Sequence, residues 1–327
     1  MDNYVIGYNP ISFVLCFLLD DLKIIDVAPE YNLYDYHLAD LYLKPSVEVL
    51  ELSDKLGLDC KVQNYRAYFG FNNKVSPIVP SNFQEIYNLY TRGKNFVEGE
   101  YKKHLDPFVN YFSINGKNPF DSYIFLIKKL EDYILENNLF VKGSIGSIEN
   151  GFLNLNESEK VPYNKLIYTE NLEELDLMLR GFSIKDFVFK HYYPEDKVGI
   201  SLPLHDKYVY ICENESQFDR DMTHLTYHIS YTGKPYFKKT YHNNKIIYES
   251  TRQIFQKDIE GNSVLYSRKT KLMKDNLNLN KVCGIDLIGR LSQCYESLIL
   301  KDVILRAKKL MEKYFDEEKG KKILLNN

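Results

Sequence analysis

Four residues near the N-terminus have the types and spacing needed to hold a phosphate group and a sugar. They are Gly7, Asn9, Ser12 and Asp26. Gly7 follows a short apolar run, and Asp26 ends a second apolar run about 20 residues later, the spacing expected for a dinucleotide-binding unit. A helix N-terminus after a tight turn attracts phosphate through free N–H groups and its dipole. A carboxylate after the second strand accepts hydrogen bonds from ribose hydroxyls.

The turn departs from the G-x-G-x-x-G fingerprint at two positions. Asn9 and Ser12 stand where the second and third glycines are expected. Asn9 tolerates left-handed backbone better than most residues, but its side chain takes up space in which the backbone should approach a phosphate. Ser12 is small enough for close packing of the helix on the strand. An ordinary βαβ unit without a nucleotide is an equally good interpretation of these residues alone.

The apolar pattern predicts the elements that would position these side chains. It predicts a strand at 4–6, a helix at 11–19 and a strand at 22–26. Further helices are predicted at 45–58, 121–137, 172–179 and 297–314, with a frayed tail from Asp316. Strands are predicted within 60–75, at 139–141, 144–148, 152–155, 165–169 and 283–288, and in an antiparallel pattern over 186–271. Residues 83–118 read as mixed helix and loop. We expect 1–30, 139–171 and 282–315 to form one nucleotide-type domain, because none of them has a complete core alone.

Composition narrows the class of protein. The chain has 327 residues, 44% of them hydrophobic, with a formal net charge of −3, which is typical of globular proteins and gives no electrostatic argument for nucleic acid. The five scattered cysteines indicate neither a zinc site nor a disulfide framework; buried, reduced thiols in a cytoplasmic protein are expected. The apolar run at 11–19 is too short to cross a membrane and is read as the first buried helix.

Taken in order, these segments resemble the superfamily of flavin-containing amine oxidases, protoporphyrinogen oxidases and UDP-galactopyranose mutases. The matching segments are 5–26, 45–58 with its Leu56-Gly57-Leu58 ending, 139–151, 161–169 (VPYNKLIYT) and 288–291 before the terminal helix. Each motif is short, so their shared order and spacing carry the resemblance.

The resemblance implies an α/β fold. Its core would be an FAD-binding Rossmann-like domain of the glutathione-reductase type, with an inserted, largely antiparallel substrate-type β-sheet domain and helices. The implied division gives 1–44, 139–180 and 282–327 to the FAD/NAD(P)-binding domain. Residues 45–138 would be a helical or mixed insertion, and 181–281 the antiparallel β domain.

The resemblance also implies FAD as the cofactor. The residues implied at its pyrophosphate are Gly7, Asn9, Pro10 and Ser12. Asp26 would hold the adenosine ribose, Ile145 would lie beside the adenine, and Thr169 would close the cofactor strand. Gly289 and Arg290 would meet the ribityl chain and phosphate, a role that suits the fixed cation and five donors of arginine.

The segment after the ribose acid also departs from that pattern. The family usually has a Gly-Gly pair after the ribose acid, whereas residues 27–32 read VAPEYN. Either FAD sits in an altered pocket, or binding has been lost while the scaffold remains. For Arg290, a salt bridge to Asp286 or Glu296 is an equally good interpretation.

Two further arginines are candidate ligands of a substrate phosphate or carboxylate. Arg220 lies in the segment FDRDMTH, which resembles the family segment that places an arginine after the β-sheet domain. Pairing of Arg220 with Asp219 or Asp221 on a solvated loop is the alternative. Arg252 is the second candidate.

Histidines give no metal site. His224 and His228 are four residues apart, but their neighbours favour a strand and no third ligand is evident. His37 is read as an exposed loop residue. We therefore expect no metal.

These observations lead to an expected FAD-dependent oxidoreductase that transfers a hydride from an amine or alcohol carbon to FAD, whose chemistry the cofactor would supply. A UDP-galactopyranose-mutase-like enzyme is one alternative, with Arg220 and Arg252 binding the diphosphate. A cofactor-free binding or scaffold protein on a decayed flavoprotein fold is the other. The expected partner is a small molecule, nucleotide-linked or not. The sequence identifies no general base.

Overall fold

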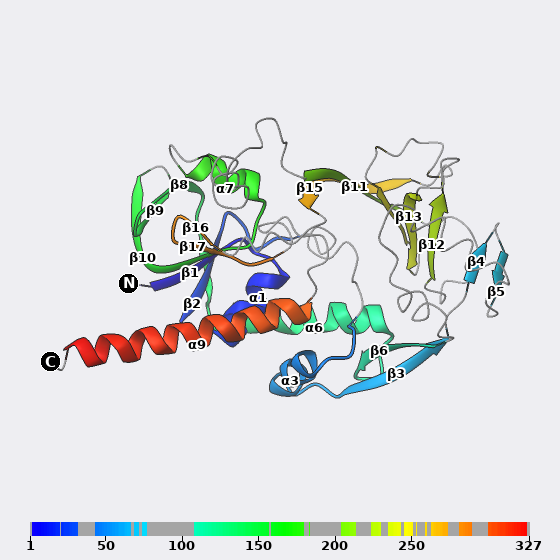
Figure 1. The fold of residues 1–327 in the computed structure, drawn as a ribbon, viewed down its shortest axis with the longest axis horizontal. Helices are drawn as coiled ribbons and strands as arrows, with labels where there is room; N and C mark the ends of the chain where they lie inside the picture. Colours follow the sequence, from blue (N-terminus) through cyan, green and yellow to red (C-terminus); the bar gives the residue numbers. More distant parts are fainter. Residues whose placement is uncertain are drawn as a thin grey trace, which may run out of the picture. The chain divides into compact units, whose positions relative to one another are not determined.

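The computed structural model describes most of the N-terminal half and the strands and helices of the remainder (Figure 1). The described residues are 2–19, 21–31, 43–66, 69–71, 74–76, 108–156, 158–179, 183, 204–213, 224–229, 235–242, 245–250, 253, 259, 263–273, 281–289 and 300–325. The chain divides into two compact units. The first comprises Met1–Lys61, Phe112–Leu204 and Leu272–Asn327, and the second comprises Val62–Tyr111 and His205–Lys271. The three-part division expected from the sequence remains a prediction.

The first unit is built on a sheet whose five central strands are parallel. In spatial order they are β17 (Ile285–Leu287), β10 (Glu159–Tyr168), β1 (Asp2–Ile6), β2 (Leu22–Asp26) and β7 (Phe140–Lys142). The short β16 (Lys281–Val282) pairs antiparallel with β17 at one edge. Strands from both ends of the chain therefore share one sheet, as the sequence predicts.

Helices and a hairpin cover this sheet on its two sides (Figure 1). On one side lie α1 (Pro10–Leu18), α6 (Pro119–Glu136) and α9 (Leu300–Leu325), which share one buried core with the sheet. On the other lie the hairpin of β8 (Ile145–Glu149) and β9 (Phe152–Leu155) and the short α7 (Leu172–Met178). Val5 and Ile24 are fully buried in the middle. Because both faces are covered, the central strands are apolar where they cross the middle of the sheet, as in Tyr4–Ile6 of β1 and Ile24 and Ile25 of β2.

The second unit contains an antiparallel sheet, as the pattern over 186–271 predicts. Its order is β12 (His224–Ile229), β13 (Pro235–His242), β14 (Lys245–Ser250), β11 (Leu204–Glu213) and β15 (Val264–Met273). A separate small hairpin is formed by β4 (Phe69–Phe71) and β5 (Lys74–Ser76). Two further strands, β3 (Cys60–Arg66) and β6 (Phe108–Ile114), pair with each other. Each of them contains a point at which the sequence passes from one unit to the other.

Three sequence expectations are corrected. Residues 108–114, expected to be helix or loop, form β6, whose aromatic and β-branched residues suit a strand. Helix α3 (Val47–Lys55) buries Val49 and Leu52 but leaves Val47 65% exposed, so its apolar face is narrower than expected. Helix α9 continues to Leu325 instead of fraying from Asp316, in keeping with the many Lys, Glu and Leu residues of this segment.

Candidate functional site

The candidate site is the turn between β1 and α1, where parallel strands end at one edge of the sheet. Gly7 follows β1, and its N–H donates to the carbonyl of Ile25 on β2 (3.1 Å). Thr169 follows β10, the other neighbour of β1, and its N–H donates to the carbonyl of Ile6 (3.2 Å). This edge is the usual ligand-binding edge of an open α/β sheet. The order of the elements therefore brings three predicted residues, Gly7, Asp26 and Thr169, to one place.

Asn9 is the N-cap of helix α1. Its backbone is extended (φ −154°), not left-handed as its residue type suggested. Its Oδ1 accepts hydrogen bonds from the N–H groups of Ile11 (3.0 Å) and Ser12 (3.1 Å). Pro10, at the first helical position, has no N–H. The first turn of α1 therefore has its donors satisfied by the protein itself.

A buried polar network surrounds that cap. The Asn9 Nδ2 donates to Thr169 Oγ1 (2.8 Å), and the hydroxyls of Ser12 and Thr169 are 3.0 Å apart. Thr169 Oγ1 in turn donates to the carbonyl of Ile6 (2.8 Å). All three side chains belong to fully buried residues. Buried polar groups are costly unless satisfied, so these bonds fix α1 against β1 and β10.

Glu170 completes the network, and the sequence analysis missed it. Its Oε1 accepts from Asn9 Nδ2 (2.7 Å). The same oxygen lies 2.3 Å from the point that a Cβ on Gly7 would occupy, so the carboxylate stands directly over the turn. The signal that could have found it is its position after Thr169 at the end of a strand beside β1, since neighbouring parallel strands end at the same edge.

Asp26 lies at the end of β2, where the sequence analysis placed the ribose acid. Its Oδ2 accepts from the N–H of Tyr8 (2.7 Å) and its Oδ1 from the N–H of Val27 (2.6 Å). Asp26 is partly exposed. Each carboxylate oxygen has two lone pairs, so Asp26 holds the turn and still has capacity to accept from an external hydroxyl.

Tyr8 fixes the other side of the turn. Its ring packs edge-on against Phe13 (4.8 Å between centroids) and Phe140 (5.3 Å), and its hydroxyl donates to Glu131 on α6 (3.1 Å). Burial, followed by the Glu131 charge, raises the pKa of the Tyr8 hydroxyl well above its ordinary value. The neutral phenol is therefore the stable form, acting as a donor and a packing group.

The structure describes some of the remaining predicted residues, and others lie outside the described part of the chain. Gly289 is buried just after β17, next to Ile288, whose N–H donates to the carbonyl of Tyr168 (3.1 Å). Ile145 begins β8 and pairs with Leu155 in the hairpin. Arg290, Arg220, Arg252 and His37 lie outside the described residues. His224 and His228 lie on β12.

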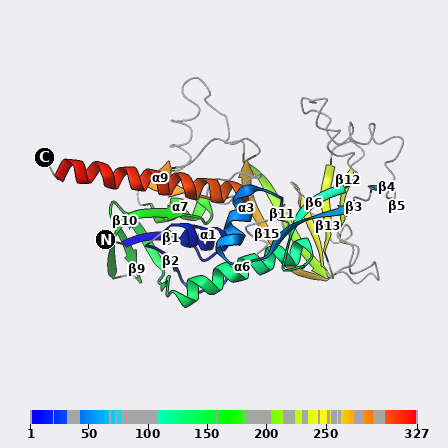
Figure 2. The same cartoon turned by 90° about the horizontal axis from the view of Figure 1, so that it is seen from below.

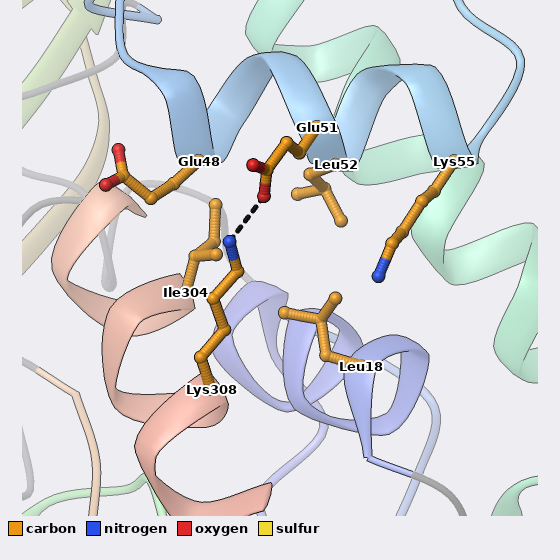
Figure 3. A pocket seen from close by; sticks show the side chains of 7 residues that line it. All are labelled: Leu18, Glu48, Glu51, Leu52, Lys55, Ile304 and Lys308. Atoms are coloured by element: carbon orange, nitrogen blue, oxygen red, sulfur yellow. Dashed lines mark hydrogen bonds and ion pairs between the residues drawn. The ribbon is translucent and has the colours of Figure 1, made fainter. Parts of the chain in front are cut away.

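The described residues form no group of three or more metal-ligating side chains. None of the described helices is long and apolar enough to cross a membrane. A crevice of about 10 Å³ lies between α1, α3 and α9, and it is lined partly by the Glu51–Lys308 ion pair (Figure 3). That space suits about one water molecule.

Two of the described thiols differ from the expectation of burial, since Cys60 is only partly buried and Cys283 is exposed. Cys16 and Cys212 are buried, as expected, and both are free of disulfides. Cys283 is exposed, because it forms the turn between β16 and β17 with a left-handed backbone (φ +48°).

Solved structures with the same fold include oxidoreductases and a mutase, all at very low sequence identity. Cyclohexylamine oxidase from Brevibacterium oxydans IH-35A matches with a TM-score of 0.53 and 8% identity, over 97% of this chain and 99% of that chain. An oxidoreductase from Methanosarcina mazei matches with a TM-score of 0.50 and 9% identity, over 95% and 100%. A reduced UDP-galactopyranose mutase matches with a TM-score of 0.50 and 9% identity, over 96% and 95%.

These likenesses define the class of the fold. No family model matches the sequence, and no curated protein matches it. The chain has the mixed α/β fold of these oxidoreductases and of the mutase, which confirms the predicted resemblance at the level of the fold.

In this conformation, the turn between β1 and α1 does not fit the pyrophosphate of FAD. A phosphate on a helix N-terminus needs free N–H groups, and here Asn9 accepts from those of Ile11 and Ser12. A phosphate also carries negative charge, and the Glu170 carboxylate already lies over Gly7. Asn9, which stands where a glycine is expected, and Glu170 therefore close the turn with side chains of the protein.

Proposed function

We propose that this chain is a cofactor-free binding protein built on a flavoprotein oxidoreductase fold. The observation that carries the proposal is the Asn9 cap, whose Oδ1 accepts from both remaining N–H groups of the first helical turn at 3.0 and 3.1 Å. The expected ligand is a small molecule bound elsewhere on the fold. The near-neutral charge of the chain gives no reason to expect nucleic acid.

Electrostatics supports the same proposal. A helix N-terminus stabilises a nearby anionic group. Near the N-terminus of α1, the Glu170 carboxylate, which accepts from Asn9, already takes that position. A diphosphate there would face a like charge at close range, and like charges in contact repel strongly even at the effective dielectric of a protein surface. Binding FAD would require both Asn9 and Glu170 to leave their hydrogen bonds.

An FAD-dependent oxidoreductase is the second candidate, and Asp26 is the observation that favours it. This carboxylate keeps the position of a ribose acid at the end of β2 and is partly exposed. In that case the flavin would accept a hydride from an amine or alcohol carbon. The mutase-like alternative depends on Arg220 and Arg252 as ligands of a diphosphate, a role that stays a prediction.

Purification of the full chain tests the proposal. We expect a colourless protein without flavin absorption, and no saturable change in FAD fluorescence when the protein is titrated into FAD. The matched variant is Asn9→Gly with Ser12→Gly, which removes side-chain atoms from the turn. Retention of stoichiometric flavin by the wild type would refute the proposal and favour the oxidoreductase. FAD binding by the double variant alone, at equal folded fraction, would support it and show that the Asn9 side chain closes the turn.

A further inference from the structure

Gly7 has a use in this fold that needs no cofactor. Its φ of +108° belongs to the region that favours glycine. A Cβ at this position would lie 2.3 Å from Glu170 Oε1, 2.6 Å from Glu170 Cγ and 2.8 Å from Asn9 Nδ2. The remaining fingerprint glycine is therefore required by two of the protein's own side chains.

The hydrogen bonds around Asn9 connect the helix N-terminus to Glu170. The N–H groups of Ile11 and Ser12 donate to the side-chain Oδ1 of Asn9, and the side-chain Nδ2 of Asn9 donates to the Glu170 carboxylate. Hydrogen bonds in such a chain polarise one another. The carboxylate is thus one amide group away from the positive end of α1, in the electrostatic position that a bound phosphate takes in other proteins.

Glu170 is held there by its neighbours. Thr169 is tied to β1 through two hydrogen bonds to the carbonyl of Ile6, from its N–H (3.2 Å) and its Oγ1 (2.8 Å). A group attached to the protein at a fixed position has a high effective concentration at its target. Glu170 therefore meets Asn9 without the entropy loss that a free anion would suffer.

We propose that Glu170 is an internal ligand of the β1–α1 turn, which takes the place of a phosphate and competes with any phosphate that enters. This inference deepens the proposed function. It rests on that function only for the statement that no cofactor is resident in the turn. The competition itself does not depend on that absence, because a carboxylate over Gly7 opposes a phosphate whether or not FAD binds.

Pyrophosphate and FAD are the probes, and calorimetric titration measures their affinity. Because Asn9 itself caps the N–H groups of Ile11 and Ser12, the comparison is made in the Asn9→Gly background. There Glu170→Ala should bind inorganic pyrophosphate at least roughly tenfold more tightly than Asn9→Gly alone, since a like charge in contact is removed. Glu170→Gln should also bind more tightly, because it keeps the shape and loses the charge. The matched control is Glu174→Gln, which removes an exposed charge on α7 and should change the affinity much less.

Each outcome decides the inference. Equal affinity in Asn9→Gly and in both of its Glu170 variants, or no binding to any of the three up to millimolar pyrophosphate, overturns it. If the wild type proves to carry FAD, the proposed function fails, yet the inference stands if Glu170→Ala binds FAD more tightly and fails if it binds equally or more weakly.

A second measurement does not depend on any ligand. Gly7→Ala should lower the thermal midpoint of the wild type by more than it lowers that of Glu170→Ala, because the new Cβ meets Glu170 Oε1 only when that side chain is present. The backbone strain of alanine at φ +108° is common to both backgrounds and cancels. Equal losses in the two backgrounds would contradict an occupied turn.

Discussion

Asn9 illustrates what a single side chain does where a glycine was expected. Its oxygen caps α1 and its nitrogen contacts both Thr169 and Glu170. The sequence predicted that the Asn9 side chain would take up space near a phosphate, which stays a prediction; in the structure that side chain caps α1. The sequence did not predict the cap, because residue type alone left the backbone conformation open. It also could not predict Glu170, whose contact joins residues far apart in the chain.

Removing this cap should cost more stability than removing an ordinary one. Asn9→Ala should lower the free energy of unfolding by about 2 kcal/mol, the upper end for a cap, since buried Thr169 also loses a partner. The control is Ser46→Ala, which removes the cap of α3, where Ser46 Oγ accepts from the Val49 N–H (3.2 Å), and should cost about 1 kcal/mol. Urea unfolding measures both. An equal or smaller loss for Asn9→Ala would contradict the network.

Asp26 has a structural role that is separable from any ribose contact. Asp26→Ala leaves the N–H groups of Tyr8 and Val27 without their acceptor, so we expect a loss of about 1–3 kcal/mol. Asp26→Asn keeps an acceptor oxygen and should lose less. If FAD binds, Asp26→Ala should also weaken it by roughly 1.5–3 kcal/mol. Unchanged urea midpoints in both variants would exclude the structural role.

Buried tyrosines predict sensitivity to alkali. Burial is the main cause that raises the pKa values of Tyr8, Tyr31 and Tyr168. Above pH ~10 the unfolded chain loses these protons while the folded chain keeps them, so the free energy of unfolding falls as pH rises. Tyr8→Phe should reduce that fall by about 1 kcal/mol per pH unit. Identical slopes for wild type and variant, from urea unfolding between pH 9 and 11, would contradict a buried neutral phenol.

At the scale of elements, the local pattern of apolar residues predicted helices and strands correctly where one face or the whole of the element is buried. Helix α1 and strands β1 and β2 were predicted because apolar runs of the right length lie between turn residues. Strand β6 was missed because Phe108–Ile114 becomes a strand only by pairing with β3, distant in the sequence. For α3 the periodicity was correct, but the neighbours that decide which apolar residues are covered are not encoded locally.

At the contact between α3 and α9, the contributions of apolar packing and of charge to stability can be measured separately. Figure 2 shows α3 beside the start of α9, where Glu51 and Lys308 form an ion pair whose side chains are 49% and 35% exposed. Such pairs contribute about 0–1 kcal/mol, so Lys308→Ala should cost less than 1 kcal/mol. Leu52→Ala, at a residue only 1% exposed, should cost about 2–5 kcal/mol. The reverse order in thermal or urea unfolding would show that charge dominates this contact.

At the scale of the molecule, the first unit is assembled from three separated parts of the chain. Its sheet alternates strands from the beginning, the middle and the end of the sequence. The resemblance predicted this assembly from the order of weak motifs, which no single motif would have supported. The candidate site was predicted less completely, because its chemistry depends on which side chains meet at the edge of the sheet.

The assembly predicts that the C-terminal helix stabilises the N-terminal strands. Ile304 on α9 is 1% exposed and belongs to the same core as Val5 and Ile24. Ile304→Ala should therefore lower the free energy of unfolding by about 2–5 kcal/mol. It should also speed amide hydrogen exchange at β1 and β2, because their slow exchange requires opening of this shared core. Met311→Ala, on the same helix but 49% exposed, is the control and should leave exchange at β1 unchanged. Faster exchange confined to α9 itself would mean that the helix packs on the unit without supporting its sheet.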